Sequence, residues 1–252
     1  MTRSDFRRFA LAAVATPLAL GLASCDETDT ASASISGEPI AAIAAPEGKS
    51  WSEMVEKTPE GGYRMGNPDA PIKLVEFASL TCSHCAAFAA ESSAELKQDF
   101  VDSGRVSVEF HNFVANPLDL TIAMLTRCGQ PGAFFALTEQ ALANQNAILE
   151  KWSQAGEAQA SQAASQPPEK RYQAFAAIAG LTDFFAARGI ATEQASACLA
   201  NAQGAEALVA TTSAQSKEFE ITGTPAFLLN GQKANVNTWS EIKAQLENLG
   251  AR

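Results

Sequence analysis

The sequence has few cysteines and histidines, and fewer basic than acidic residues. Among 252 residues there are five Cys and two His, and 18 Lys and Arg against 28 Asp and Glu give a net charge of −10. No basic run follows Arg8. Because phosphate binding needs clustered Lys and Arg, we expect no nucleic-acid partner. After residue 25 no apolar run approaches the roughly 18 residues that span a bilayer. The length suits one globular domain with a substantial core.

The first 24 residues have the composition of an export signal. Three arginines within the first eight residues precede an apolar run over 9–22, and Leu22-Ala23-Ser24-Cys25 follows. This order predicts a signal peptide over 1–24 rather than a buried N-terminal helix. Leu-Ala-Ser-Cys also resembles the bacterial lipobox, which implies lipidation of Cys25. We therefore expect a periplasmic protein that is lipid-anchored to a membrane. Asp26 resembles a signal for retention in the inner membrane.

Residues 26–50 are rich in Ala, Ser, Asp, Glu, Gly and Pro and show no amphipathic period. Such composition is typical of a flexible tether. We predict a lipid-anchored flexible linker over 25–60 and a folded domain over 61–252.

The folded part begins with an α/β pattern. Residues 72–78 form an apolar run typical of a central strand, and a helical pattern follows from Cys82 to about residue 102. Residues 106–113 then alternate with period two, which predicts a second strand. Strand, helix and strand in this order indicate a parallel pair.

An Ala- and Gln-rich block follows, over about 117–218, and shows no convincing strand. Helices are expected near 117–128, 131–149, 169–179, 181–188 and 192–200, with 161–168 as the most loop-like piece. An apolar run over 225–229, the turn Asn230-Gly231 and a short run over 233–236 then predict a β-hairpin. Residues 239–249 predict a closing helix.

The motif Cys82-Ser83-His84-Cys85 lies where the first strand leads into the first helix. This motif has three interpretations: half of a zinc site, a redox dithiol or coincidence. Zinc needs a second pair of ligands, and Cys128 and Cys198 are too far apart in sequence to supply one at the usual spacing. At a helix N-terminus, unpaired N–H groups and the macrodipole favour a thiolate at Cys82 and lower its pKa. Cys85 lies one turn deeper, and His84 adds a donor or a positive charge. The placement favours a redox dithiol.

Two separated segments resemble the DsbA-like thiol–disulfide oxidoreductases of the bacterial periplasm. Residues 76–85 (EFASLTCSHC), with Phe88, are similar to the active-site segment of that family. Residues 223–227 (GTPAF), followed by Asn-Gly, are similar to its second signature, and the helical block matches its inserted domain. The resemblance implies an α/β, thioredoxin-like fold with an inserted all-helical domain, and no cofactor or metal. Ser83 departs from the proline common in this dipeptide, which leaves the redox potential open, and His84 matches the oxidising members.

The resemblance also assigns roles to supporting residues. It implies a cis peptide between Thr224 and Pro225 facing the disulfide, so that the Thr224 backbone pairs with a substrate strand; an ordinary strand proline is the alternative. It implies that Glu76 is a buried acid that relays a proton to or from Cys85; a solvated edge carboxylate is the alternative.

Cys128 and Cys198 both lie in the helical block. If Cys25 carries lipid, four cysteines remain and permit three pairings, of which adjacent pairing is the simplest. Two buried free thiols are the alternative to a structural disulfide. Members of the resembled family are described with a second, non-catalytic disulfide, which favours the bridge.

These observations predict a monomeric, tethered enzyme that transfers a disulfide from Cys82–Cys85 to the thiols of exported proteins. A membrane redox partner must then reoxidise the pair. A disulfide reductase or isomerase is one alternative. The other is a non-catalytic tethered chaperone or metal-binding protein that uses Cys82, His84 and Cys85.

Overall fold

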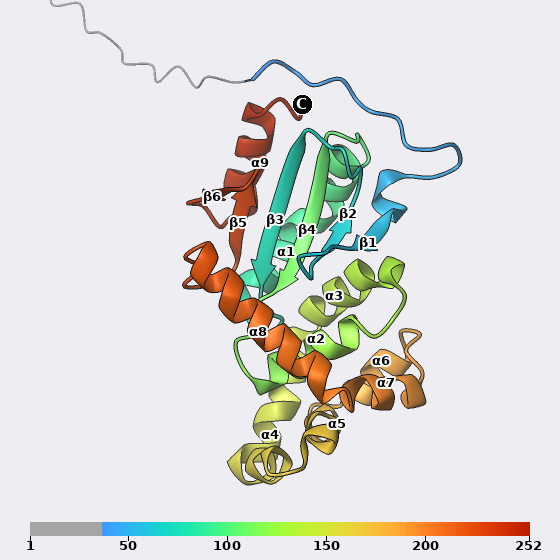
Figure 1. Cartoon of the computed structure of the whole chain (residues 1–252), viewed down its shortest axis with the longest axis vertical. Helices are drawn as coiled ribbons and strands as arrows, with labels where there is room; N and C mark the ends of the chain where they lie inside the picture. The colour runs from blue at the N-terminus through green and yellow to red at the C-terminus, as the bar shows by residue number, and fades with distance from the viewer. Residues whose placement is uncertain (1–36) are drawn as a thin grey trace, which may run out of the picture. The chain divides into compact units, whose positions relative to one another are not determined.

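The computed structural model describes residues 37–252 (Figure 1). Within them the strands form one six-stranded sheet in the order β1-β2-β4-β3-β5-β6. The central strands β3 and β4 are parallel, and every other neighbouring pair is antiparallel. The bounds are β1 Val55–Lys57, β2 Tyr63–Met65, β3 Ile72–Ala78, β4 Val106–Asn112, β5 Ala226–Leu229 and β6 Gln232–Ala234. The parallel pair confirms the predicted strand–helix–strand unit, whereas β1 and β2 were not expected.

Helix α1 (Ser83–Glu95) connects β3 to β4 and continues into a π-helical segment, η2 (Leu96–Val101). Helix α9 (Trp239–Asn248) closes the chain, and Thr238 and Glu241 form a capping box at its start. The Phe88 ring of α1 packs against Phe227 of β5 and Trp239 of α9, with ring centroids 4.6 and 6.2 Å apart. This aromatic contact fixes α1 against the sheet.

The helical insertion lies at the carboxyl ends of β3 and β4, toward which both arrows point in Figure 1. Its helices are α2 Pro117–Thr126, α3 Phe134–Ala143, α4 Gln145–Ala164, α5 Pro168–Ile178, α6 Leu181–Ala186, α7 Thr192–Leu199 and α8 Ala202–Glu218, with a 3-10 turn η3 over Pro131–Ala133. A thioredoxin-like sheet with an inserted all-helical domain is therefore the observed fold class.

Three parts of the insertion differ from the sequence prediction. The single helix expected near 131–149 is divided into η3, α3 and the start of α4. Helix α4 runs through 161–164, where a loop was expected, and a kink at Gly156 (φ 73°) interrupts it. Helix α8 was not predicted at all. Both helices bury only three residues each, and most of their other side chains are small or polar, so they lack the continuous apolar stripe that reveals a helix in sequence.

The predicted boundary between a flexible linker over 25–60 and a domain over 61–252 needs correction. The backbone N–H groups of Gly37, Ile40 and Ile43 donate to carbonyls of Asn248, Gly250 and Ser103, at 2.6, 2.9 and 2.8 Å. A 3-10 turn η1 (Trp51–Glu53) with a buried Trp51 follows, and β1 joins the sheet. Residues 37–60 thus belong to the folded domain, held largely by backbone hydrogen bonds that composition does not reveal.

The predicted signal peptide over 1–24 and the lipidation site Cys25 lie outside the described residues. Among the helices within 37–252, none combines the length and the apolar character needed to cross a membrane.

Candidate active site

The two cysteines occupy the turn between β3 and α1. Cys82 is the N-cap of α1, with extended backbone (φ −89°, ψ 120°), and its N–H donates to the Ser79 carbonyl at 3.2 Å. Its own carbonyl accepts from Ala86 N–H at 3.1 Å and so begins the helix. Cys82 is partly exposed, whereas Cys85, in the first turn, is fully buried, and both are free thiols in the structure. Cys82 is therefore accessible from solvent, whereas Cys85 is not.

The Thr224–Pro225 segment lies beside the Cys82 sulfur. The Thr224–Pro225 peptide is cis, and the Cys82 thiol donates to the Thr224 carbonyl at 3.3 Å. Burial alone raises the pKa of Cys82. Hydrogen bonds from the Thr224 side chain, from the backbone and thiol of Cys85 and from the His84 N–H outweigh it, so the pKa lies below its usual range. Cys82 is therefore the readily ionised thiol of the pair.

The Cys85 thiol has the opposite electrostatics. Burial is the main cause that raises its pKa far above the usual range, and the charges of Glu76 and Cys82 raise it further. Cys85 therefore stays protonated when it is reduced, and it must gain or lose a proton each time the disulfide opens or closes.

Glu76 lies in the middle of β3, with only 8% of its surface exposed. Burial, and secondarily the charge of Glu139, raise the pKa of Glu76 to about 8. The predicted burial of this acid is observed, and a solvated edge carboxylate is the wrong alternative. A carboxyl that titrates near neutral pH beside Cys85 has the acidity that proton transfer requires.

Two residues of the insertion hold the loop before Cys82. Asp119 of α2 accepts from Leu80 N–H through Oδ1 and from Ala115 N–H through Oδ2, both at 2.8 Å. Burial raises the pKa of Asp119 to about 6, although these hydrogen bonds oppose the rise. Gln145, the first residue of α4, donates through Nε2 to the carbonyls of Leu80 and Cys82, both at 3.0 Å. The insertion therefore fixes the position of the active-site turn.

Sequence reasoning missed both supporting residues. Asp119 has a local signal, because it stands three residues after Asn116, whose side chain caps α2 by accepting from Asp119 N–H. Gln145 has none: it lies 63 residues from Cys82 in sequence, and its amide meets the turn only in the folded chain.

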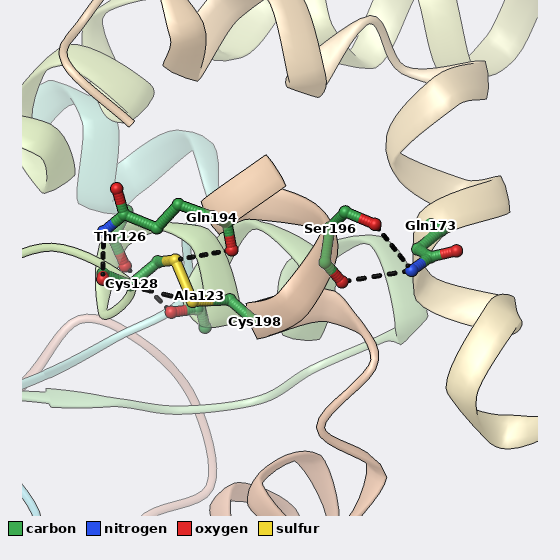
Figure 2. The surroundings of a disulfide bond; sticks show 7 residues. All are labelled: Ala123, Thr126, Cys128, Gln173, Gln194, Ser196 and Cys198. Atoms are coloured by element: carbon green, nitrogen blue, oxygen red, sulfur yellow. Dashed lines mark hydrogen bonds between the residues drawn. A yellow bond between two sulfur atoms is a disulfide. The ribbon is translucent and has the colours of Figure 1, made fainter. Parts of the chain in front are cut away.

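The remaining predicted residues divide between two places. Ser83 and His84 are exposed in the first turn of α1, beside the thiols. Cys128 and Cys198 are disulfide-bonded within the insertion, with Cα atoms 5.8 Å apart, and join the end of α2 to α7 (Figure 2). Figure 2 also shows Gln194 of α7 reaching Cys128, where its amide donates to the Cys128 carbonyl at 2.9 Å. The Cys128–Cys198 disulfide connects two helices of the insertion and contributes no group to the Cys82 turn.

Metal ligation has no visible site in the described part of the chain. Within residues 37–252, no three His, Cys, Asp or Glu side chains gather as a ligand set. The arrangement around Cys82 instead has the features of thiol exchange: one ionisable, partly exposed cysteine, one buried cysteine and one buried acid.

Comparisons with known proteins agree with this geometry. The family model described as thioredoxin matches residues 58–248. Proteins of Rickettsia bellii and Rickettsia conorii that are named as protein-disulfide oxidoreductases are each 28% identical, over 76% and 69% of this chain. The matched part spans only 65% and 55% of those two proteins.

Solved structures extend the similarity. A protein-disulfide isomerase from Novosphingobium aromaticivorans is 34% identical, with a TM-score of 0.69 over 73% of this chain and 94% of that one. The alpha-DsbA1 structure of Wolbachia pipientis has a TM-score of 0.60 over 75% of this chain and 90% of that one. At 20% identity, this second likeness concerns the fold alone.

Proposed function

The chain belongs to the thioredoxin family, as a DsbA-like member of it, and on this premise we propose that it catalyses thiol–disulfide exchange through Cys82 and Cys85. The observation that carries the proposal is the contrast between the two sulfurs. Cys82 is partly exposed at a helix N-cap with a lowered pKa, and Cys85 is buried with a raised pKa. Unequal thiols of this kind divide the reaction between an attacked sulfur and a leaving sulfur.

The exchange begins when a substrate thiolate attacks the Cys82 sulfur of the oxidised pair. The substrate–Cys82 bond forms, the Cys82–Cys85 bond breaks, and Cys85 leaves as a thiolate. Because its pKa is raised, this thiolate takes up a proton, and Glu76 is the buried acid positioned to give it. A second substrate thiolate then attacks the substrate sulfur of the mixed disulfide. Cys82 leaves as a stabilised thiolate, and the substrate carries away the new disulfide.

We propose that the substrates are thiols of exported proteins and that the direction is oxidation. The lowered pKa of Cys82 makes it a good leaving group, which favours release of an oxidised substrate. The Thr224 carbonyl at 3.3 Å from the sulfur offers a backbone acceptor to an extended substrate segment. A membrane redox partner then reoxidises the reduced pair.

The predicted export signal over 1–24 and the lipobox-like segment at Cys25 support our proposal of a periplasmic enzyme anchored by N-terminal lipid, and we propose that it is a monomer. Cell fractionation and mass spectrometry of the mature N-terminus test this location. A protein that begins well after residue 25 and is free in the periplasm would remove the anchor and leave the proposed chemistry intact.

A reductase or isomerase is the second candidate, and one observation favours the isomerase: the 34% identical structure from Novosphingobium aromaticivorans is that of a protein-disulfide isomerase. The equilibrium potential of the Cys82–Cys85 pair against glutathione separates the two directions. A potential of about −120 mV supports the oxidase, and one of about −270 mV supports the reductase. Shuffling of a scrambled substrate disulfide by the reduced protein would support the isomerase.

Two cysteine variants test the chemistry itself. Cys85→Ser should accumulate a mixed disulfide when it is mixed with a disulfide-bonded substrate, because the Cys82 thiolate attacks that disulfide and no second thiol of the protein is left to release it. Cys82→Ser should lose all thiol exchange. If Cys82→Ser retained the effect of the protein on substrate folding, the non-catalytic chaperone would replace the enzyme.

A further inference from the structure

A pocket lies where the end of α2 meets the β1–β2 turn and the start of α8. Its volume is about 280 Å³, close to the lower end of the roughly 300–1,000 Å³ that is typical of small-molecule sites. Strands β1 and β2 contribute Lys57 and Tyr63, the end of α2 contributes Met124 and Arg127, and α8 contributes Ala207 and Leu208. Neither the Cys82 turn nor the Thr224–Pro225 segment lines this pocket.

Arg127 lines the pocket as a partly buried cation without an acidic partner. Among residues 37–252, no carboxylate lies within ion-pair distance of its guanidinium. Burial lowers the pKa of Arg127, and the charge of Tyr63 is the one influence that opposes the shift. Because buried charges in proteins are normally paired, this guanidinium lacks a counter-ion.

The Arg127 guanidinium is held in a fixed position and still has N–H groups to donate. Nη1 donates to the Asn112 side chain at 2.9 Å, and Nη2 donates to the Gly61 carbonyl at 2.6 Å. The guanidinium carbon lies 4.8 Å from the centroid of the Tyr63 ring. A guanidinium has five N–H groups, and the remaining ones donate to no residue in the described part of the chain. A fixed guanidinium with free N–H groups is suited to bind a carboxylate.

The rest of the lining adds one charge and an apolar surface. Lys57 is exposed at the end of β1, and it forms no ion pair with any residue within 37–252. The lining contains no Asp or Glu, although the whole chain carries a net charge of −10. Met124, Leu208 and the Cys128–Cys198 disulfide supply apolar surface. Two cations beside apolar surface match a small anion that has an apolar part.

We propose that this pocket binds a small organic carboxylate. The carboxylate group pairs with Arg127 and Lys57, and the apolar part of the ligand packs against Met124 and Leu208. A volume of about 280 Å³ suits a small molecule rather than a folded segment of a partner protein. Because the ligand contacts β1, α2 and α8 at once, it stabilises the packing of the insertion against the edge of the sheet. The site uses neither catalytic cysteine, so it is independent of the thiol exchange proposed above.

Hexanoate is the probe, and its neutral amide, hexanamide, is the matched control. Titration of isotopically labelled protein should move the NMR signals of the Gly61 and Gly204 amides, which line the pocket, and leave that of Gly231 in place. The shifts should saturate with a dissociation constant of about 1 mM or below, and hexanamide should bind at least about tenfold more weakly. No saturation by about 10 mM hexanoate, or equal binding of the two compounds, would refute the proposal. Inorganic phosphate that binds as tightly as hexanoate would overturn the carboxylate as the ligand class.

Two variants of α8 distinguish a missing counter-ion from an arginine with a structural role alone. Ala207 is exposed and lines the pocket, so Ala207→Glu should supply a carboxylate from the chain itself. The control, Ala210→Glu, adds the same charge to the same helix outside the pocket. Ala207→Glu should lose hexanoate binding and should melt at a higher temperature than Ala210→Glu, which should bind as wild type does. Equal hexanoate affinity in the two variants would contradict the proposal.

Substitutions of the two cations test their assigned roles. Arg127→Gln removes a charged hydrogen-bond donor and should weaken hexanoate binding by at least about tenfold. Lys57→Gln should weaken it by up to about fivefold, since exposed ion pairs are weak, and it carries the test if Arg127→Gln fails to fold. Lys73→Gln is the control, because Lys73 is an exposed lysine of β3 outside the pocket, and its affinity should equal that of wild type. If Lys57→Gln and a folded Arg127→Gln both bind as tightly as Lys73→Gln, the proposal fails.

The accessibility of the cysteines locates the bound ligand. Cys128 and Cys198 line the pocket, so hexanoate should slow the reduction of their disulfide by a water-soluble phosphine. The reduction should slow by about tenfold when hexanoate is at about ten times its dissociation constant. Alkylation of reduced Cys82 should keep its rate under the same conditions. Protection of Cys82 in place of the disulfide would put the ligand at the active site and overturn the proposal, whereas loss of thiol exchange in wild type would overturn the proposed function alone.

Discussion

The burial of Glu76 makes the stability of this protein depend on pH in a defined direction. The pKa of Glu76 rises from 4.5 to about 8 in the folded chain, chiefly through burial. Between these values the unfolded chain has released the proton and the folded chain still holds it. The contribution of Glu76 is therefore fully present below pH 4.5 and is lost as pH rises through about 8.

Glu76→Gln removes this dependence, because an amide does not ionise. The wild-type free energy of unfolding should fall relative to the variant by about 1.4 kcal/mol per pH unit. By pH 8 the difference should reach about 5 kcal/mol in favour of Glu76→Gln, and below pH 4.5 the two proteins should agree within about 1 kcal/mol. The variant should thus be the more stable protein at pH 8 and the poorer enzyme.

Urea unfolding of the reduced proteins at a series of pH values measures this difference. Glu241→Gln serves as the control, because its exposed carboxyl has a pKa lowered by hydrogen bonding to Thr238. The pH dependence of its stability should have the opposite sign. Glu241→Gln should be less stable than wild type above the pH range in which carboxyl groups usually ionise, because the variant lacks the stabilised carboxylate. Parallel pH profiles for wild type and Glu76→Gln, or a variant that is weaker at pH 8, would refute the buried-acid reasoning.

Three further predictions concern the cysteines and their support. At about pH 6, limiting iodoacetamide should label Cys82 and spare Cys85, because only Cys82 is partly exposed and has a lowered pKa. Peptide mass spectrometry measures the labelling, and equal labelling of both thiols would contradict the assignment. Gln145→Leu should lower the free energy of unfolding by about 2–4 kcal/mol and slow thiol exchange, because two carbonyls of the active-site turn lose their hydrogen-bond donor. An unchanged denaturation midpoint and an unchanged exchange rate would contradict this. Replacing Cys128 and Cys198 by Ala should lower the free energy of unfolding by roughly 4 kcal/mol, as expected for a disulfide that closes a loop of 70 residues. The pKa of Cys82 should stay constant. A shifted Cys82 pKa would show coupling between the two cysteine pairs.

Residues close in sequence account for what could be predicted without the structure. A strand that leads into a helix at Cys82 follows from an apolar run, a cysteine pair and a helical pattern within some 30 residues. The Asn230-Gly231 turn indicates its hairpin in the same way, and that hairpin carries the segment beside Cys82. Each of these signals depends on backbone preference or side-chain period, which act over a few residues.

Strands β1 and β2 and the segment over 37–49 have no such local signal in the sequence. They are short, and their positions depend on backbone hydrogen bonds to distant carbonyls, such as Ile43 N–H to Ser103. Backbone groups are the same in every residue, so composition does not show which segments will pair. The flexible linker was therefore predicted too long.

The sequence by itself predicted the Cys82–Cys85 pair and its place at the helix start, because those signals lie in neighbouring residues, and it predicted the class of fold through the resemblance of two separated segments. Only the tertiary structure decided how the pair is supported. Gln145 and Asp119 meet the active-site turn from the insertion. Such contacts depend on how the insertion packs against the sheet. The environment of Glu76, and hence its acidity, is set by burial among residues that are distant in sequence, since desolvation is a property of the whole fold.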